Sequence, residues 1–176
     1  MIFHAVIKNT VKWFILIFGI SKRPEGMENL PKSGGFIVSA NHSSNWDGLK
    51  LGTLLPGYIR VLSKKELFNN KILGWMLPRV GAIPVERGKG DVGAMRAAEE
   101  ALMGGACLMI FPQGTRKKVF RVEDGKKGAE RLAEKCAVPV VPCAIKGRRI
   151  IIGKPIEAPK TIEIMEKIEE LLKERG

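Results

Sequence analysis

Two short motifs contain the residues of this 176-residue chain that are best suited to chemistry. One reads N-H-S-S-N-W-D at residues 41–47, and the other reads F-P-Q-G-T-R at residues 111–116. A histidine with a nearby carboxylate supplies a base and an acid that orients it. A glycine turn followed by an arginine presents backbone N–H groups and a guanidinium. Together these parts predict acyl transfer to a phosphorylated acceptor.

The spacing of His42 and Asp47 restricts where each residue lies. Within one helix, five residues of separation would place them about 140° apart on the helical wheel, where they cannot meet. We therefore expect His42 in the loop after a strand and Asp47 in the first turn of a helix, where the helix dipole favours a carboxylate. An H-x4-D pattern is weak alone, so a carboxylate beside an unrelated histidine remains an alternative.

Apolar runs of strand length alternate with helical patterns along the chain, which predicts an α/β fold. We expect a single domain in which helices flank a mostly parallel central sheet. The expected strands are 36–40, 59–62, 82–85, 107–111, 138–145 and 149–152, and the expected helices are 46–55, 91–103, 125–137 and a final helix capped by Thr161. A basic hairpin-like stretch is expected after the second motif.

Two details of these elements follow from residue types. Because proline cannot donate to a ladder, the prolines of strand 138–145 demand an edge position or strand ends. The helical period predicts which side chains face the core. For helix 91–103 these are Val92, Met95, Leu102 and Met103, and for the final helix they are Ile162, Met165, Ile168 or Glu169, and Leu172.

The second motif follows the apolar strand 107–111. Gly114 permits a turn whose backbone N–H groups point outward, and loops at the carboxyl ends of strands are where open α/β folds bind ligands. A plain strand-ending turn is the structural alternative.

The chain is strongly basic, with 30 lysines and arginines against 18 acidic residues and a net charge of +12. This charge favours a polyanionic partner such as nucleic acid, an anionic membrane or a phosphorylated substrate. Cys107, Cys136 and Cys143 form no C-x-x-C pattern, which indicates a reducing environment. With only His4 and His42 as further ligands, we expect no metal site.

The first 30 residues predict a membrane-associating segment that precedes an α/β domain at residues 31–176. An apolar run at 13–20 follows His4, Lys8 and Lys12, which are spaced by four residues. The run is shorter than the roughly 18–20 residues of a membrane span, so an interfacial helix fits better. A core helix that packs on the domain is the alternative.

Several motifs together resemble those of the glycerolipid acyltransferase family. The family's N-H-x4-D matches residues 41–47, and its F-P-E-G-T-R matches residues 111–116 except at Gln113. Its K-x-E-L, G-x-I-x-x-x-R and V-P-[IV]-V-P elements are similar to residues 64–67, 81–87 and 138–142. These motifs occur in the family's order, and the resemblance covers residues 36–147.

The resemblance implies acyl transfer from an acyl thioester, carried by acyl carrier protein or coenzyme A, to the sn-2 hydroxyl of 1-acyl-glycerol-3-phosphate (lysophosphatidic acid). The product would be phosphatidic acid, formed with no covalent acyl-enzyme and no cofactor beyond the thioester co-substrate. The protein would lie on the cytoplasmic face of an anionic phospholipid membrane, monotopic or peripheral. Another lyso-lipid acceptor remains open.

The resemblance also implies roles for individual residues. His42, oriented by Asp47, would be the general base. Arg87, Arg116 and Lys65 would bind the acceptor phosphate, although a solvated basic face is an alternative for such cations. The turn of Gln113, Gly114 and Thr115 would bind the oxyanion.

Gln113 departs from the family, which usually has glutamate at this position. The amide keeps its capacity for hydrogen bonds but loses a charge partner for an arginine, so we expect activity to be retained. The pattern G-x-G-x-x-G at residues 88–93 lacks the acidic residue expected about 20 positions later, so we do not expect a dinucleotide site.

A non-catalytic protein that binds anionic lipid or nucleic acid is the alternative from another functional class. It would explain the charge but neither of the two motifs. Three tryptophans, one tyrosine and seven phenylalanines leave few aromatic side chains for base stacking, so nucleic acid is not expected as a partner.

Overall fold

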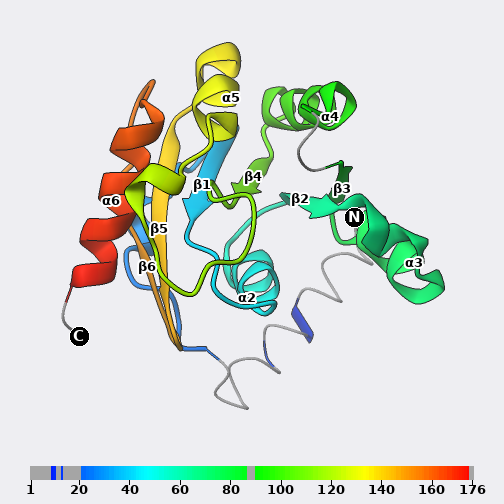
Figure 1. Cartoon of the computed structure of the whole chain (residues 1–176), viewed down its shortest axis with the longest axis horizontal. Coiled ribbons are helices and arrows are strands. Elements are labelled where there is room, and N and C mark those ends of the chain that lie inside the picture. Colours follow the sequence, from blue (N-terminus) through cyan, green and yellow to red (C-terminus); the bar gives the residue numbers. More distant parts are fainter. Residues whose placement is uncertain (1–8, 11–12, 14–20, 87–89, 175–176) are drawn as a thin grey trace.

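A six-stranded sheet forms the centre of the protein in a computed structural model that describes residues 9, 10, 13, 21–86 and 90–174 (Figure 1). The strands are β1 (Phe36–Ala40), β2 (Ile59–Lys64), β3 (Ala82–Val85), β4 (Cys107–Ile110), β5 (Val140–Lys146) and β6 (Arg149–Ile152). Their order is β3-β2-β4-β1-β5-β6, and only β6 pairs antiparallel among these strands. The predicted α/β fold with a mostly parallel sheet is confirmed.

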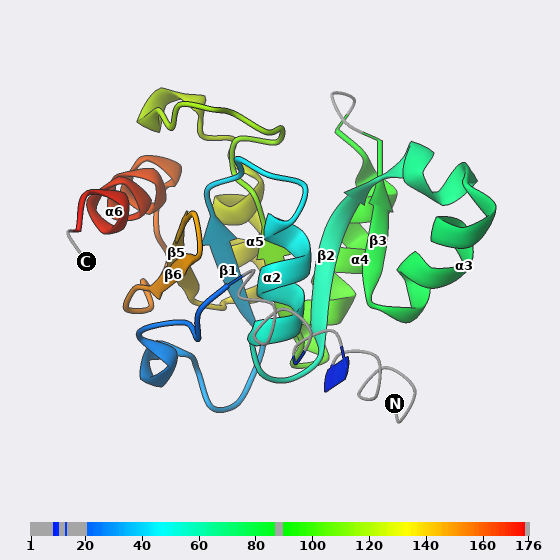
Figure 2. The same ribbon diagram turned by 90° about the horizontal axis from the view of Figure 1, so that it is seen from below.

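Helices cover both faces of this sheet (Figures 1 and 2). They are α2 (Asp47–Leu54), α3 (Lys71–Arg79), α4 (Val92–Met103), α5 (Gly128–Cys136) and α6 (Thr161–Lys173). Val38 of β1 packs in the cluster that contains α2, whereas Ile37 packs in the cluster that contains α4, α5 and α6. Strands buried on both faces are nearly continuous apolar runs, which explains why these segments could be recognised.

The pairing of β1 with β4 brings the two motifs together. Ser39 lies opposite Ile110 in this parallel pair, so both strands end at the same edge of the sheet. Residues 41–47 and 111–116 therefore leave the sheet side by side, although about 70 residues separate them in sequence.

Asn41 secures the end of β1 to β5. Its buried side-chain Nδ2 donates to the Ile145 carbonyl at 3.0 Å, and its Oδ1 accepts from the Ile145 N–H at 2.7 Å. The amide side chain thus extends the ladder beyond the strand and holds the start of the first motif against the sheet.

Of the two expected positions for the prolines, an edge strand is wrong, because β5 lies between β1 and β6. A strand end holds for Pro139, which precedes the strand. Pro142 lies inside β5 and pairs with Ser39 of β1, but toward β6 it lies one residue before the first pair, Cys143 with Ile152. The missing N–H groups are tolerated because the prolines occupy such positions.

Several expectations about the helices also need correction. Val92 and Met103 of α4 are exposed, and its buried side chains are Ala94, Ala98 and Leu102. In α6 the buried side chains are Ile164, Met165 and Ile168, and Ile162 is exposed. The other predicted side chains face the core, because Leu102, Met165 and Ile168 are buried and Met95 and Leu172 pack against it. The period therefore selected the right face, and the errors lie at the helix ends.

Thr161 is the first residue of α6 and does not cap it with its side chain. Its backbone N–H and its hydroxyl both donate to Glu130 Oε2 of α5, at 2.8 Å and 2.6 Å. Hydrogen bonds from Thr161 are also the main reason that the pKa of Glu130 lies below its usual value. The residue therefore joins two helices.

The stretch between β4 and α5 is a loop with a single 3-10 turn at Val122–Asp124, and the expected hairpin is absent from it. Helix α3 has no counterpart among the predicted elements. Asn70 caps it by accepting the N–H groups of Ile72 and Leu73, and none of its side chains is buried. It is followed by the predicted strand β3.

The predicted N-terminal membrane segment falls mostly outside the described residues, which include only 9, 10 and 13 of the first 20. The segment from Ser21 to Leu30 runs beside β6, where Glu25 forms a bridge with Ile151. Across the described part of the chain, no helix combines the length and apolar character needed to cross a membrane.

Candidate active site

The structure brings His42 and Asp47 into direct contact. The His42 Nδ1 atom lies 3.1 Å from Asp47 Oδ2, and Asp47 is the first residue of α2. The chain turns between the two residues, as the spacing required. Because an ionised carboxylate only accepts hydrogen bonds, the proton of this bond belongs to Nδ1 and the lone pair to Nε2. The ring is therefore prepared to take a proton at Nε2.

Asp47 is held as an anion by its surroundings. Its side chain is 1% exposed, and its Oδ2 atom also accepts the backbone N–H groups of Ser43 and Ser44, at 2.8 Å and 2.7 Å. Burial opposes ionisation, but the hydrogen bonds from His42, Ser44 and Ser43 together outweigh it and lower the pKa of Asp47. The carboxylate thus remains charged beside the imidazole.

The second motif forms the support for His42. The Gln113 Oε1 atom accepts the His42 backbone N–H at 3.2 Å, and the Lys117 backbone N–H donates to the His42 carbonyl at 2.8 Å. The Phe111 ring stacks on the imidazole, with 4.1 Å between centroids and an interplanar angle of 17°. The base is therefore restrained through its backbone, one face of its ring and its Nδ1 atom.

The turn itself is closed by a local hydrogen bond. Gly114 has a φ of 70°, in the left-handed region that favours glycine, and its N–H donates to the Phe111 carbonyl at 2.9 Å. This N–H is consequently occupied in the turn and does not point outward as we expected. Thr115 is exposed, so the later amides of the motif are better candidates for an oxyanion.

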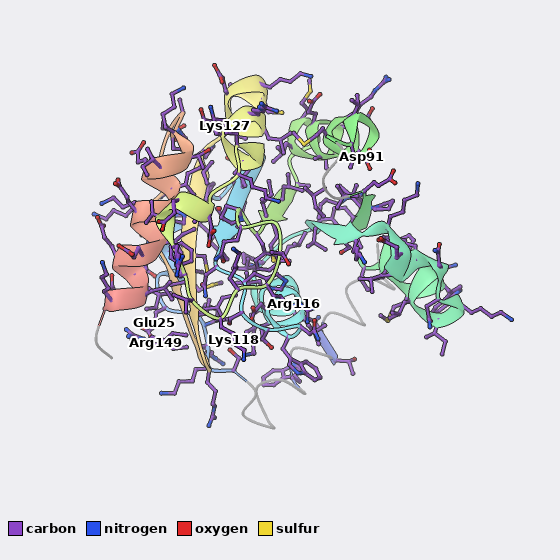
Figure 3. The ribbon with its side chains drawn as sticks, in the orientation of Figure 1. Glu25, Asp91, Arg116, Lys118, Lys127 and Arg149 are labelled. Atoms are coloured by element: carbon purple, nitrogen blue, oxygen red, sulfur yellow. The ribbon has the colours of Figure 1, made fainter. Side chains whose placement is uncertain are left out.

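The predicted phosphate-binding cations are distributed unevenly. Arg116 lies beside α2 (Figure 3), where its side chain donates to Asn45 Oδ1 at 2.6 Å. Lys65 is exposed at the start of a 3-10 turn. The pKa of Asp91 is lowered by the Glu86 and Ala94 N–H groups and, to a smaller extent, by Lys65. The charge of Lys65 therefore acts on Asp91, the residue that caps α4. Arg87 lies outside the described residues.

A groove of about 1000 Å³ reaches the turn from between α4 and α5. Its lining includes Leu62, Met95, Ile110, Phe111, Gly114 and Lys126. The groove is of the size that substrates occupy, and one of its lining residues, Phe111, also stacks on the base.

Known proteins with similar sequences and structures identify the family of this chain. The family model described as Acyltransferase matches residues 23–146, a range that includes both motifs. The chain belongs to the acyltransferase family. The 1-acyl-sn-glycerol-3-phosphate acyltransferase of Bacillus subtilis (strain 168) is 35% identical to this acyltransferase over 144 residues, which cover 73% of this chain and 70% of the relative.

Two further relatives of this acyltransferase support the assignment. The chloroplastic enzyme BAT2 of Brassica napus, which carries the same enzyme name, is 33% identical over 77% of this chain and 45% of its own length. The crystal structure of the 1-acyl-sn-glycerophosphate (LPA) acyltransferase PlsC from Thermotoga maritima matches with a TM-score of 0.75 and 26% identity. That match covers 96% of this chain and 76% of the other.

Some site residues of the acyltransferase have contacts that sequence reasoning missed. Phe111, Asn45, Lys117 and Lys126 lie in or beside the two motifs. Asn45 was expected as a helix cap, and Lys117 and Lys126 as cations that hold the domain on anionic lipid, but their contacts within the site were not expected. In the sequence, only their positions in or near the two motifs could have indicated these contacts. Stacking of Phe111 on His42 depends on the order of strands in the sheet, which a local sequence pattern does not predict.

Proposed function

We propose that this acyltransferase transfers an acyl chain from a thioester to the sn-2 hydroxyl of 1-acyl-glycerol-3-phosphate and so forms phosphatidic acid. The 3.1 Å contact between His42 Nδ1 and Asp47 Oδ2 carries this proposal, because it provides an oriented base. The relatives are named as acyltransferases for 1-acyl-sn-glycerol-3-phosphate, which supplies the substrate class. The chain spans 70% of the Bacillus relative and less than half of the Brassica relative, so the activity of the whole enzyme is part of the proposal.

The proposed reaction is direct transfer between the two substrates. His42 Nε2 takes the proton of the acceptor hydroxyl as its oxygen attacks the thioester carbonyl carbon. The negative charge that develops on the carbonyl oxygen is stabilised by backbone N–H groups of the turn after Gly114. When the C–S bond breaks, the thiolate leaves and takes the proton from His42. Asp47 stabilises the imidazolium between these steps.

The surroundings of the ring favour direct transfer over an acyl-enzyme. The hydrogen bond described for the His42 ring goes to Asp47, and Ser43 and Ser44 contribute their backbone N–H groups to that carboxylate. A covalent mechanism would instead need a hydroxyl or thiol bonded to the base. No such side-chain contact to the ring occurs within residues 21–86 and 90–174.

Replacement of the base tests the proposal. His42→Ala should lower phosphatidic acid formation by about 10²- to 10⁴-fold, the usual contribution of a general base, and leave vesicle binding unchanged. Product would be measured by mass spectrometry from 1-acyl-glycerol-3-phosphate and acyl thioesters. Ser43→Ala is the matched control, because the exposed Ser43 contacts Asp47 through its backbone alone. Turnover by His42→Ala close to that of the control would contradict the assigned base.

The thioester carrier and the location of the enzyme belong to the same proposal. We propose acyl carrier protein or coenzyme A as the carrier, with the enzyme on the cytoplasmic face of an anionic membrane. The charge of +12 supports both, because each carrier and the membrane surface are anionic. Parallel assays with the two thioesters would identify the carrier.

A further inference from the structure

Lys126 lies directly over the glycine of the second motif. A Cβ atom placed on Gly114 would be 2.7 Å from Lys126 Nζ and 3.0 Å from its Cδ and Cε atoms. The Lys126 backbone N–H donates to the Pro112 carbonyl at 2.9 Å, so the same turn holds the main chain of this lysine. Both the side chain and the backbone of Lys126 therefore lie against the turn, and this places the ammonium group at the turn.

The Lys126 ammonium has no carboxylate partner among the described residues, unlike three other lysines of this part of the molecule. Lys117 pairs with Asp124 at 3.1 Å, Lys135 with Glu99 at 2.8 Å, and Lys160 with Glu130 at 3.5 Å. In the part of the chain that the structure describes, no ion pair involves Lys126. Its charge is consequently available to a bound anion.

The two cations of the turn lie on different sides of Gly114. The Arg116 guanidinium is held at Asn45 beside α2, whereas Lys126 lines the groove between α4 and α5. Figure 3 shows the same division, with Arg116 beside α2 and Lys127, the neighbour of Lys126, beside α5. A phosphate over the turn would therefore meet positive charge from two directions.

The short distance between the reacting hydroxyl and the phosphate of the acceptor favours a phosphate beside Lys126. About four covalent bonds, roughly 5 Å, separate the sn-2 oxygen of 1-acyl-glycerol-3-phosphate from its phosphorus. The reacting hydroxyl must reach His42, whose ring stacks on Phe111 with 4.1 Å between centroids. Phe111 is the first residue of the turn, and Lys126 crosses this turn at Gly114. A phosphate so close to the hydroxyl falls within reach of a flexible ammonium, which binds phosphate as a point charge.

We propose that Lys126 is a further phosphate-binding residue of the active site and contacts the phosphate of the lysophospholipid acceptor. This inference rests on the proposed function. It assigns Lys126 to the site as a binding residue, beside the expected Arg116.

Lys126→Met and the matched control Lys154→Met test this assignment. Both remove one exposed charge, but only Lys126 crosses Gly114 and lines the groove. Lys126→Met should raise KM for 1-acyl-glycerol-3-phosphate by about 10- to 100-fold, the effect of one charged hydrogen bond, with kcat little changed. Lys154→Met should stay within about threefold of the native enzyme, and Lys126→Arg should recover part of the loss.

Two further measurements separate this inference from its alternatives. With 1-monoacylglycerol, which has no phosphate, Lys126→Met and the native enzyme should have equal rates. An equal loss on both acceptors would place the lysine at the thioester instead and overturn the proposal. Binding of sn-glycerol 3-phosphate, followed by NMR, needs no turnover, and Lys126→Met should weaken it by about tenfold or more. Native-like binding by a folded Lys126→Met variant would also overturn the proposal, whatever reaction the enzyme catalyses.

Discussion

At the scale of single residues, the site contains a histidine base whose ring and backbone are both held in place. The His42 ring is bound at Nδ1 by Asp47 and stacked on Phe111, and its backbone is bound by Gln113 and Lys117. Fixed geometry lets a base reach the proton without reorganisation. The lowered pKa of Asp47 keeps this arrangement charged. Its contribution to stability is complete above its ordinary pKa of 3.8 and is lost as pH falls through the lower pKa of the folded state.

Gln113 allows a prediction at this scale. Its buried Oε1 atom accepts the His42 N–H, and its Nε2 atom has no hydrogen-bond partner among the described residues. A glutamate would keep the acceptor and remove the unpaired donor, at the cost of a buried charge. We expect the native enzyme to be active and Gln113→Glu to lie within about tenfold of it. Gln113→Ala should lose about 10- to 100-fold, because it leaves the His42 N–H unpaired.

Initial rates of acyl transfer with each variant would check this prediction. The decisive comparison is between the native enzyme and Gln113→Glu. A silent native enzyme with recovery in Gln113→Glu would show that the family's charge is required. A fully active Gln113→Ala would show instead that the hydrogen bond to the His42 backbone is dispensable.

At the scale of elements, the order of strands assembles the site. The ends of β1 and β4 are neighbours in the sheet, and β5 lies on the other side of β1. Each motif is thereby attached to a buried strand that cannot shift without disturbing the core. Loops on rigid strands position side chains better than free loops do.

Asn41 tests how firmly β1 is attached to β5. Asn41→Ala should lower the free energy of unfolding by about 2–4 kcal/mol, because it leaves the Ile145 N–H and carbonyl buried without partners. Urea unfolding followed by circular dichroism would measure the loss. Asn45→Ala is the control and should cost about 0.5 kcal/mol or less, since Asn45 is exposed and its side chain accepts a hydrogen bond from the exposed Arg116 guanidinium. Equal stabilities for the two variants would contradict this role of Asn41.

At the scale of the whole molecule, charge and exposed aromatic side chains suggest a membrane surface. All three tryptophans and the single tyrosine of the chain are about half exposed, with 57% for Trp13, 53% for Trp46, 54% for Trp75 and 47% for Tyr58. Such side chains favour the interface between lipid and water. Trp46 precedes Asp47 directly, so at least this exposed ring adjoins the site.

Vesicle binding tests the location at this scale. The enzyme should sediment with vesicles that contain anionic phosphatidylglycerol and bind vesicles of phosphatidylcholine alone much less, because its net charge is +12. Raising salt to about 1 M shortens the Debye length to about 3 Å and should release much of the bound protein. Tryptophan emission would report the same binding as a blue shift. Equal binding to both vesicle types at low salt would contradict an electrostatic contribution.

Local sequence patterns predicted most of the elements and the meeting of His42 with Asp47. Apolar strands such as Phe36–Ala40, and caps such as Asp91, which accepts the Ala94 N–H, are properties of a few adjacent residues. The turn between His42 and Asp47 could be inferred because its spacing excluded one continuous helix. Helix α3 was missed although Asn70 offered a local cap signal.

The tertiary structure alone decided which distant residues meet. The interior position of β5 and the stacking of Phe111 on His42 depend on the order of strands in the sheet. The passage of Lys126 over Gly114 depends on how the loop between β4 and α5 folds back on itself. The sequence by itself therefore determined the elements and the chemistry of the base, because both arise from neighbouring residues. Strand order and helix orientation arise from burial of the whole core, so only the folded chain could place the support of the base and the cation over Gly114.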